Sequence, residues 1–189
     1  MSVLVRAREL IGRPVVTLDG DDIAQVKDLV FDNVSGQVDG FTLNGRGAFA
    51  GPLPEALAWE AVYSCGPDAV MIRDRHALTL RDSVVTHPDM SEADVLGSRV
   101  ISEGGRDLGQ VVDVIVLVAS VADVVGYEIE SSPELSTDRR HLLIPLPDTL
   151  SVSGEALIVP EAAIEFVSGD FAEFGAAVEA FRARLRATT

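Results

Sequence analysis

Positive charge is scarce in this sequence. It has 15 Lys and Arg residues against 30 Asp and Glu residues, which gives a formal net charge of −15 at pH 7, and Lys27 is its only lysine. A surface that binds nucleic acid neutralises phosphates with clustered cations. We therefore expect no direct binding of DNA or RNA.

Aromatic residues and long apolar runs are scarce as well. Aromatic residues make up 5% of the chain and hydrophobic residues 47%, so the expected core is aliphatic. A membrane-spanning helix needs about 18 or more consecutive apolar residues. The longest candidate, Val111 to Val125, contains Asp113 and Asp123. We therefore expect no membrane span.

Cysteine is almost absent, and so are the features of an export signal. Cys65 is the only cysteine, so no intramolecular disulfide can form, which fits a reducing compartment. The first ten residues, MSVLVRAREL, lack the small-residue cleavage site of a secretory signal peptide, and their basic residues follow the short apolar piece. These features predict a cytoplasmic protein.

An internal repeat organises the rest of the sequence. With a displacement of 85 residues, Leu10–Val30 aligns with Val95–Ile115, and with one inserted residue the match continues from 40–43 to 126–129. The identical pairs are Gly12 and Gly97, Val15 and Val100, Gly20 and Gly105, Asp22 and Asp107, Gln25 and Gln110, Val26 and Val111, and Asp28 and Asp113. This similarity indicates two copies of one module.

Each copy contains short apolar runs separated by turn signals. Pro14–Leu18 ends at Asp19-Gly20-Asp21, and Arg99–Ser102 ends at Gly104-Gly105-Arg106, where glycine can supply the positive φ of a hairpin. About five such runs per copy indicate a small β-barrel.

The predicted domain organisation follows from these runs. We predict a first barrel over residues 1–75, a polar linker over 76–92, a second barrel over 93–167 and a C-terminal helix over 168–189. Within the linker, Ser91-Glu92-Ala93-Asp94 has the form of a capping box and predicts one helical turn.

The C-terminal segment has the pattern of an amphipathic helix. Its apolar residues recur at spacings of three and four, and Ser168 and Asp170 can cap its start. The apolar stripe consists of Phe171, Phe174, Val178, Phe181 and Leu185. It must pack either on its own barrel or on a second subunit, which would make a homodimer. We favour packing on its own barrel, because the tethered helix has the higher effective concentration there.

Three segments of the first copy carry a family resemblance. The run from Leu10 to Asp32, the sequence V-D-G-F-T-L at 38–43 and the sequence L-A-W-E-A-V at 57–62 resemble the PRC-barrel domain. That small β-barrel occurs in the cytoplasmic part of the photosynthetic reaction-centre H subunit and in the C-terminal half of a ribosome-maturation factor. The second copy is similar in V-L-G-S-R-V-I at 95–101, R-D-L-G-Q-V-V-D-V at 106–114 and V-V-G-Y-E-I at 124–129.

The resemblance covers about residues 8–72 and 93–160 and includes departures from the family pattern. Where the family tends to have Pro-Trp-Glu, this chain has Ala58-Trp59-Glu60 in the first copy and Ile144-Pro145-Leu146 in the second. The resemblance implies a fold that other proteins bind as an adaptor, and it implies no catalytic residues.

Motifs that would indicate catalysis, a cofactor or a metal are weak or missing. The acidic loop Asp19–Asp22 could attract a cation, but Asp-Gly is typical of a tight hairpin and the second copy has Gly104-Gly105-Arg106 there. The glycine-rich loop 45–51 leads into Pro52 rather than a helix, so it does not fit a dinucleotide site. The three histidines, at 76, 87 and 141, have no zinc-ligand spacing. We expect no catalytic, cofactor-binding or metal-binding residue.

Three further residues stand out. Asp28 and Asp113 occupy equivalent places in apolar strands. Each is either a binding group at a barrel end, or else an outward-facing strand residue or a local hydrogen-bond acceptor; we favour the second interpretation. Trp59 is the only tryptophan and could anchor a protein partner, although we favour a core position for it.

These observations together predict a mainly β protein made of two tandem small barrels with a C-terminal amphipathic helix. The leading functional hypothesis is a non-enzymatic adaptor that binds an unidentified protein. One alternative is a homo-oligomeric assembly protein, and another is a module that responds to a small molecule or metal bound between the barrels. The candidate interface residues are Trp59, Phe171, Phe174, Val178, Phe181 and Leu185.

Overall fold

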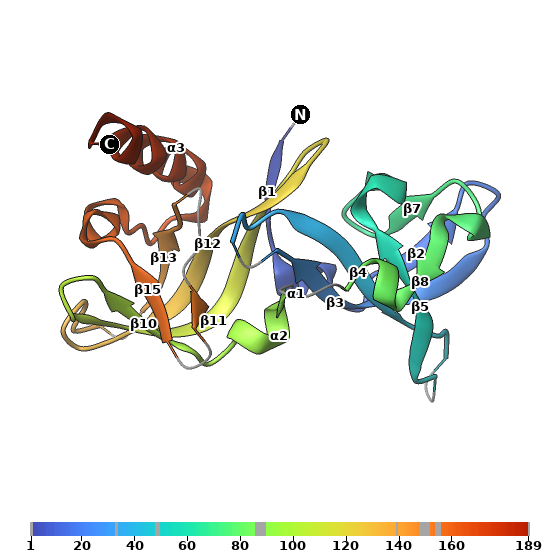
Figure 1. Ribbon diagram of the computed structural model, residues 1–189, viewed down its shortest axis with the longest axis horizontal. Coiled ribbons are helices and arrows are strands. Elements are labelled where there is room, and N and C mark those ends of the chain that lie inside the picture. The colour runs from blue at the N-terminus through green and yellow to red at the C-terminus, as the bar shows by residue number, and fades with distance from the viewer. Residues whose placement is uncertain are drawn as a thin grey trace.

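The computed structural model describes residues 2–32, 34–47, 50–85, 90–138, 140–147, 152–153 and 156–188. Two β-sheets form two lobes along the long axis, and β1 (Val3–Arg6), α1 (Ala7–Leu10) and α2 (Glu92–Val95) lie between them (Figure 1). The expectation of a mainly β chain with a C-terminal helix is confirmed.

The first sheet has the strand order β6-β7-β2-β3-β4-β5-β8, and β9 also pairs with β3. Neighbouring strands are antiparallel except β2 and β7, which are parallel. The bounds are β2 Pro14–Thr17, β3 Asp22–Phe31, β4 Val38–Asn44, β5 Pro52–Ala58, β6 Val62–Cys65, β7 Val70–Ile72, β8 Leu78–Leu80 and β9 Met90–Ser91. Three short 3-10 helices belong to this half: η1 Trp59–Ala61, η2 Arg75–Ala77 and η3 Arg81–Ser83.

The second sheet repeats the plan of the first. Its order is β13-β12-β11-β10-β15-β14, with β10 and β15 parallel, which corresponds to β5-β4-β3-β2-β7-β6. The bounds are β10 Arg99–Ser102, β11 Asp107–Val118, β12 Ala122–Ser131, β13 His141–Pro145, β14 Val152–Ser153 and β15 Ala156–Val159, followed by η4 Glu161–Phe166 and α3 Phe171–Thr188. In both halves the predicted hairpin turn contains a glycine with positive φ, 95° at Gly20 and 83° at Gly105.

The two halves exchange their leading strands. β1 precedes the first sheet in sequence but pairs with β11 of the second, where Arg6 lies opposite Ile115. β9 precedes the second sheet but pairs with β3 of the first, where Ser91 lies opposite Val30. Residues 6 and 91 and residues 30 and 115 each differ by the repeat displacement of 85. The exchange is therefore reciprocal.

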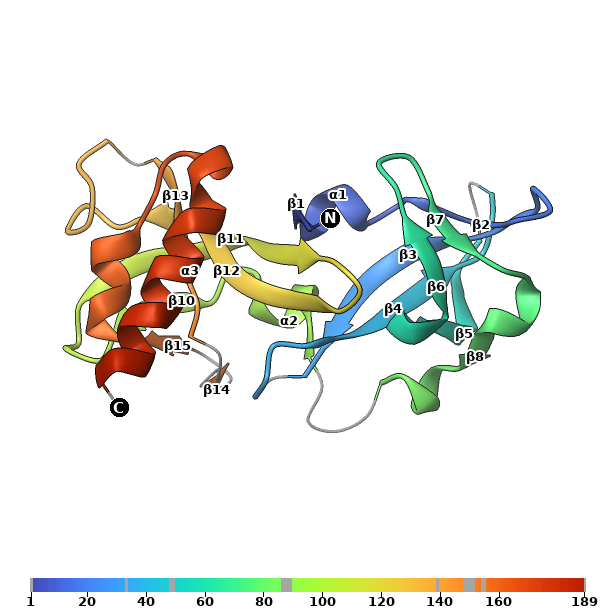
Figure 2. The same ribbon diagram turned by 90° about the horizontal axis from the view of Figure 1, so that it is seen from above.

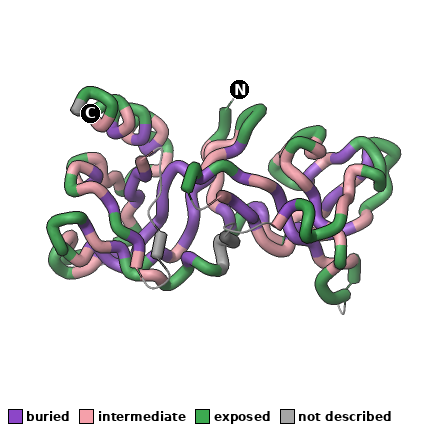
Figure 3. Tube along the Cα trace, viewed as in Figure 1, coloured by how far each residue is buried: buried purple, intermediate pink, exposed green. Residues whose placement is uncertain are grey.

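The same symmetry appears in the packing between the lobes. The helices α1 and α2 each contact both β3 and β11, and the turn before β4 meets β12 through a bridge between Gln37 and Asp123. One hydrophobic cluster, which includes the fully buried Leu10 and Val95, continues through both halves. Figure 3 shows this buried path along the central strands. The halves therefore form one packed body.

The exchange places several residues differently from the predicted boundaries. Residues 3–6, assigned to the first domain, pair with the second sheet. The segment 76–92, predicted as a linker, contains η3, β8 and β9, all of which accompany the first sheet, while His87 lies outside the described residues. β8 has only three residues and lies at a sheet edge, and its Leu80 is 68% exposed. The sequence of β8 therefore shows no alternation of buried and exposed residues from which a strand could be predicted.

The C-terminal helix α3 packs on the chain's own second half, beside β13 and η4 (Figure 2). Phe174 and Val178 are buried in a cluster with Ile115, Val125 and Leu143. Gly126 allows this approach, since a Cβ atom there would lie 2.4 Å from the Phe174 ring. Among the described residues, no helix combines the length and apolar character needed to cross a membrane.

Candidate functional site

A concave surface lies on the first half beside η1, β6 and η2. We call it the η1–β6–η2 groove; it encloses about 540 Å³ and is lined by Glu60, Ala61, Val62, Tyr63, Arg73, Asp74, His76 and Ala77. The strand β6 is at the edge of its sheet, so its outward side chains meet solvent. Tyr63 is consequently 53% exposed.

An aromatic–cation pair forms part of this groove. The guanidinium carbon of Arg73 lies 5.1 Å from the centroid of the Tyr63 ring. Such stacking holds a long cationic side chain against a flat apolar surface. Neither residue was singled out by the sequence, because nothing in the pattern V-Y-S-C indicates that β6 is an edge strand whose tyrosine points outward.

Acidic and basic groups lie at the rim of the groove. The side chain of Asp74 caps η2: its Oδ1 accepts a hydrogen bond from the His76 N–H at 2.7 Å and lies 3.1 Å from His76 Nδ1. The His76 side chain is 99% exposed and that of Asp74 is 56% exposed. These groups stand in water and are available for polar contacts with a binding partner.

Trp59 lies at the junction between the halves. Its ring is half-buried and packs 5.8 Å, centroid to centroid, from Phe41. Its Nε1 donates a hydrogen bond to the Ser120 carbonyl oxygen of the second half at 3.3 Å. Trp59 therefore joins the two halves.

The apolar stripe of α3 is covered by the chain itself. Phe174 and Phe181 are fully buried and Val178 is 3% exposed. Phe171 and Leu185 are half-buried, and the Arg6 guanidinium lies 4.3 Å from the Phe171 ring centroid. The middle of the stripe thus covers the second sheet, and Phe171 and Leu185 keep part of their surface exposed.

A buried charge cluster fixes β1 on the second sheet. Glu128 on β12 accepts hydrogen bonds from Arg6 Nε at 2.8 Å and from Arg6 Nη2 at 3.2 Å. Asp113 on β11 lies 3.0 Å from Arg8 Nε. Asp113 is 2% exposed and Glu128 5%. Asp113 does not face outward, because the segment that follows β1 covers this face. It is instead a local hydrogen-bond acceptor, since its Oδ1 accepts a hydrogen bond from the Val114 N–H at 2.8 Å.

The pKa values of the two buried carboxyl groups are shifted in opposite directions. Burial raises the pKa of Asp113 above its ordinary value, and the N–H groups and charge around it offset only part of this effect. Burial also acts to raise the pKa of Glu128, but the hydrogen bond and charge of Arg6, with the charges of Arg8 and His141, hold this pKa below its ordinary value. The cluster thus favours a charged Glu128 and penalises a charged Asp113.

The equivalent position in the first half has different partners. Asp28 lies 2.7 Å from Lys27 Nζ and accepts a hydrogen bond from Thr42 Oγ1 at 2.9 Å. Thr42 corresponds to Glu128 in the repeat, so the second half has gained a carboxylate where the first has a hydroxyl. The partners of Glu128 could not be identified from sequence, since Arg6 is 122 residues away.

The acidic loop and the glycine-rich loop that the sequence singled out are joined by one ion pair. Asp22 forms an ion pair with Arg46, while Asp19 and Asp21 are exposed. Residues 48 and 49 of the glycine-rich loop lie outside the described residues. Within the described ranges, no group of three or more His, Cys, Asp or Glu residues is arranged to hold a metal ion.

Comparison with known proteins finds a family similarity in the first half of the chain. No curated protein matches this chain. The likeness of the second half to the first rests on the repeated sequence and the shared strand order. The family model described as the PRC-barrel domain matches residues 3–78, so the part of the chain from β1 to the start of β8 is similar to that family.

Proposed function

We propose that this protein is a non-enzymatic adaptor that binds another protein through the η1–β6–η2 groove. The observation that carries the proposal is the exposed Tyr63, stacked with Arg73 inside a hollow of about 540 Å³. Tyrosine and arginine are enriched among the residues that dominate protein–protein binding energy. A concave surface lined by both suits a protruding side chain or loop of a partner.

The polar groups of the groove favour binding over catalysis. A general acid or base works best when a positioned side chain has a pKa near the operating pH, which active sites achieve by burial and close charges. His76 and Asp74 instead lie mostly in solvent. Exposed groups of this kind contribute selectivity at the rim of an interface.

The position of the groove also supports an adaptor role. All of its lining residues lie within residues 3–78, the part that matches the PRC-barrel domain, and the resemblance to that family implies protein binding. The homo-oligomer hypothesis allowed either the barrels or the helices to pair between chains, and Phe174 and Val178 of the α3 stripe are buried within the chain.

Site-specific photocrosslinking tests this proposal. A photoreactive phenylalanine analogue at position 63 should capture a discrete protein in a lysate of the native host, and Arg73→Ala in the same chain should reduce capture at least ~5-fold, because truncating a hot-spot residue typically costs more than 1 kcal/mol. The matched control places the same analogue at Ile158, which is 40% exposed on β15 of the second half.

The outcome depends on the comparison between positions. Capture of one protein from position 63, sensitive to Arg73→Ala and absent from position 158, supports the proposal. The same captured proteins from both positions, or capture unaffected by Arg73→Ala, would contradict it.

A further inference from the structure

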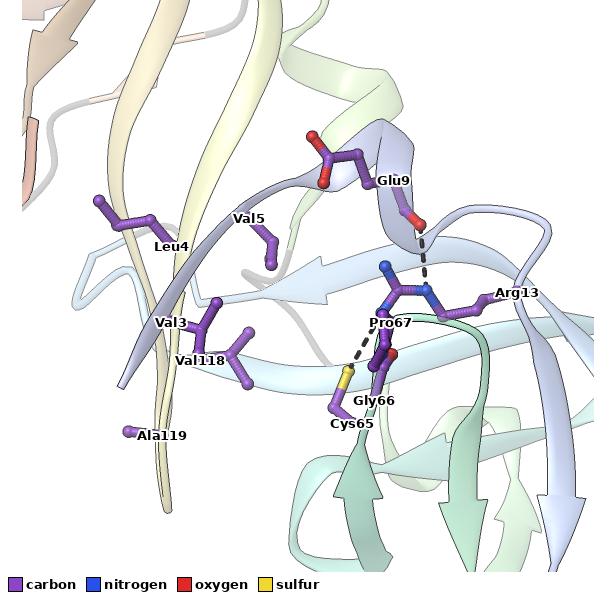
Figure 4. Close-up of a pocket in the computed structure, with 10 residues that line it drawn as sticks. All are labelled: Val3, Leu4, Val5, Glu9, Arg13, Cys65, Gly66, Pro67, Val118 and Ala119. Atoms are coloured by element: carbon purple, nitrogen blue, oxygen red, sulfur yellow. Dashed lines mark hydrogen bonds between the residues drawn. The ribbon is translucent and has the colours of Figure 1, made fainter. Parts of the chain in front are cut away.

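A second hollow lies on the junction between the halves, away from the η1–β6–η2 groove. We call it the junction pocket; it encloses about 460 Å³. One wall consists of Val3 and Val5 of β1 with Val118 of β11. The facing wall consists of Cys65 at the end of β6 and the turn that follows it (Figure 4). Its volume lies within the range of about 300–1,000 Å³ typical of small-molecule sites.

Arg13 supplies a fixed positive charge in this pocket. Its Nε donates a hydrogen bond to the Glu9 carbonyl oxygen at 3.1 Å, and its Nη1 donates to the Gly66 carbonyl oxygen. Nη1 also lies 3.9 Å from Cys65 Sγ. These three neutral acceptors hold the guanidinium in place while leaving its charge uncompensated.

The remaining nitrogen of Arg13 is available to a ligand. Within the described part of the chain, neither a hydrogen bond nor an ion pair occupies Nη2. The Glu9 carboxylate, which also lines the pocket, lies 3.8 Å from Arg6 and points away from Arg13 (Figure 4). Arg13 as a whole residue is half-buried. A half-buried cation without an anionic partner gains most from a charge-assisted hydrogen bond to a carboxylate.

The surroundings restrict the ligand to one negative charge and an apolar body. Half of the lining residues are apolar ones whose side chains are valine, proline or alanine: Val3, Val5, Pro67, Val118 and Ala119. The Glu9 carboxylate and the net charge of −15 disfavour phosphates and dicarboxylates. Burial raises the pKa of the Cys65 thiol, so this neighbour is neutral and adds no repulsion.

We propose that the junction pocket binds a small monocarboxylate with an aromatic or branched aliphatic body. Its carboxylate accepts hydrogen bonds from Arg13 Nη2, and its apolar part packs against Val3, Val5 and Val118. Because β1 and Val118 belong to the second sheet and Arg13 and Cys65 to the first half, the ligand contacts both halves at once.

The single cysteine provides a local reporter for this proposal. Cys65 lines the pocket and is the only thiol in the chain, so its alkylation by the neutral reagent iodoacetamide reports on access to this site alone. Benzoate should slow the alkylation. Benzamide, which has the same ring without the charge, should require at least ~10-fold higher concentration for the same protection, since about 1.4 kcal/mol corresponds to tenfold in binding.

Substitutions of Arg13 distinguish loss of ligand binding from disruption of the fold. Arg13→Gln should reduce benzoate protection at least ~10-fold and remove the preference over benzamide, whereas Arg13→Lys should retain part of both. Arg106→Gln is the matched control, because Arg106 also donates to a backbone carbonyl oxygen, that of Glu134, but lies elsewhere. Each rate is compared with that of the same variant without ligand, and circular dichroism verifies folding.

Three results would overturn the proposal: no protection by either benzoate or 3-methylbutanoate, equal protection by benzamide, or full benzoate protection in Arg13→Gln. The adaptor proposal is tested separately, since Tyr63→Ala should leave benzoate protection unchanged. If benzoate protects Cys65 but no partner is captured from position 63, the junction-pocket proposal is supported and the adaptor proposal is contradicted.

Discussion

Single residues at the charge cluster decide how firmly the exchanged strand is attached. Glu128 accepts two hydrogen bonds from Arg6 and is almost fully buried, so it ties β1 to β12 across 122 positions of sequence. Charge-assisted hydrogen bonds of this kind contribute about 1.5–3 kcal/mol each to stability. The cluster is therefore a main attachment of the N-terminal segment.

Replacing Glu128 should destabilise the protein and make its free energy of unfolding depend less on pH in the acid range. We expect Glu128→Gln to lower the free energy of unfolding at pH 7 by about 1–3 kcal/mol, because the variant leaves the partly buried Arg6 without its anion. The measurement is urea unfolding at pH 7 and at pH 4.

The pH dependence follows from the lowered pKa of Glu128. The unfolded chain protonates this group near its ordinary pKa of 4.5, before the folded chain does, so its stabilising contribution is complete above that pH and is lost as the pH falls through the folded pKa. The difference between wild type and Glu128→Gln should shrink towards pH 4 and below. A difference that grows on acidification would contradict this assignment.

The contribution of Asp113 to the free energy of unfolding should depend on pH in the opposite direction. Its pKa is raised in the folded protein, so its contribution is fully present below the ordinary value of 3.8 and is lost as the pH rises through the folded pKa. We expect Asp113→Asn to lower the free energy of unfolding at pH 7 by less than Glu128→Gln does. Equal or larger destabilisation in the same urea experiment would show that the ion pair with Arg8 outweighs burial.

Among the elements, α3 shows how far sequence reasoning could reach. The spacing of the apolar residues predicted a helix over 168–189, and the structure has one over Phe171–Thr188, with Asp170 Oδ1 accepting a hydrogen bond from the Ala172 N–H at 2.8 Å. Long periodic segments and turn glycines can be predicted because their signals are local. The turn at Gly20 and the helical turn at α2 were predicted for the same reason.

Short edge elements and the candidate sites could not be predicted in this way. Strands β1, β8 and β9 have four residues or fewer, and two of them pair with the sheet of the other half. Whether Tyr63 is exposed depends on β6 lying at a sheet edge, and the position of Arg13 depends on the turn that follows β6. These facts belong to tertiary packing, which no single segment encodes.

A charge within the α3 stripe should separate this helix from its sheet. We expect Phe174→Asp to lower the free energy of unfolding by at least ~3 kcal/mol, because it removes a fully buried ring and places a carboxylate among apolar residues. The control is Ala176→Asp, which puts the same charge on the exposed face of the helix. Equal melting temperatures for the two variants would show that the stripe does not stabilise the fold.

For the whole molecule, strand exchange and a shared core predict that the two halves unfold together. Each sheet contains a strand from the other half, and one hydrophobic cluster joins them. Calorimetry should therefore show one unfolding transition rather than two.

Leu10→Ala tests this cooperativity. Leu10 is fully buried in α1, which contacts both β3 and β11, and truncating a buried leucine costs about 2–5 kcal/mol. The whole transition should move to lower temperature. A scan in which only part of the heat absorption shifts would show that the halves unfold independently.

The reciprocal exchange also orders events during synthesis on the ribosome. Val3 pairs opposite Val118, so β1 leaves the exit tunnel without its partner and stays unpaired until β11 has been translated. The place on β3 that β9 fills likewise stays vacant until after β8 is made. A nascent chain halted near its midpoint thus presents both an unpaired apolar strand and an unfilled sheet edge, the features that recruit chaperones and promote misassembly.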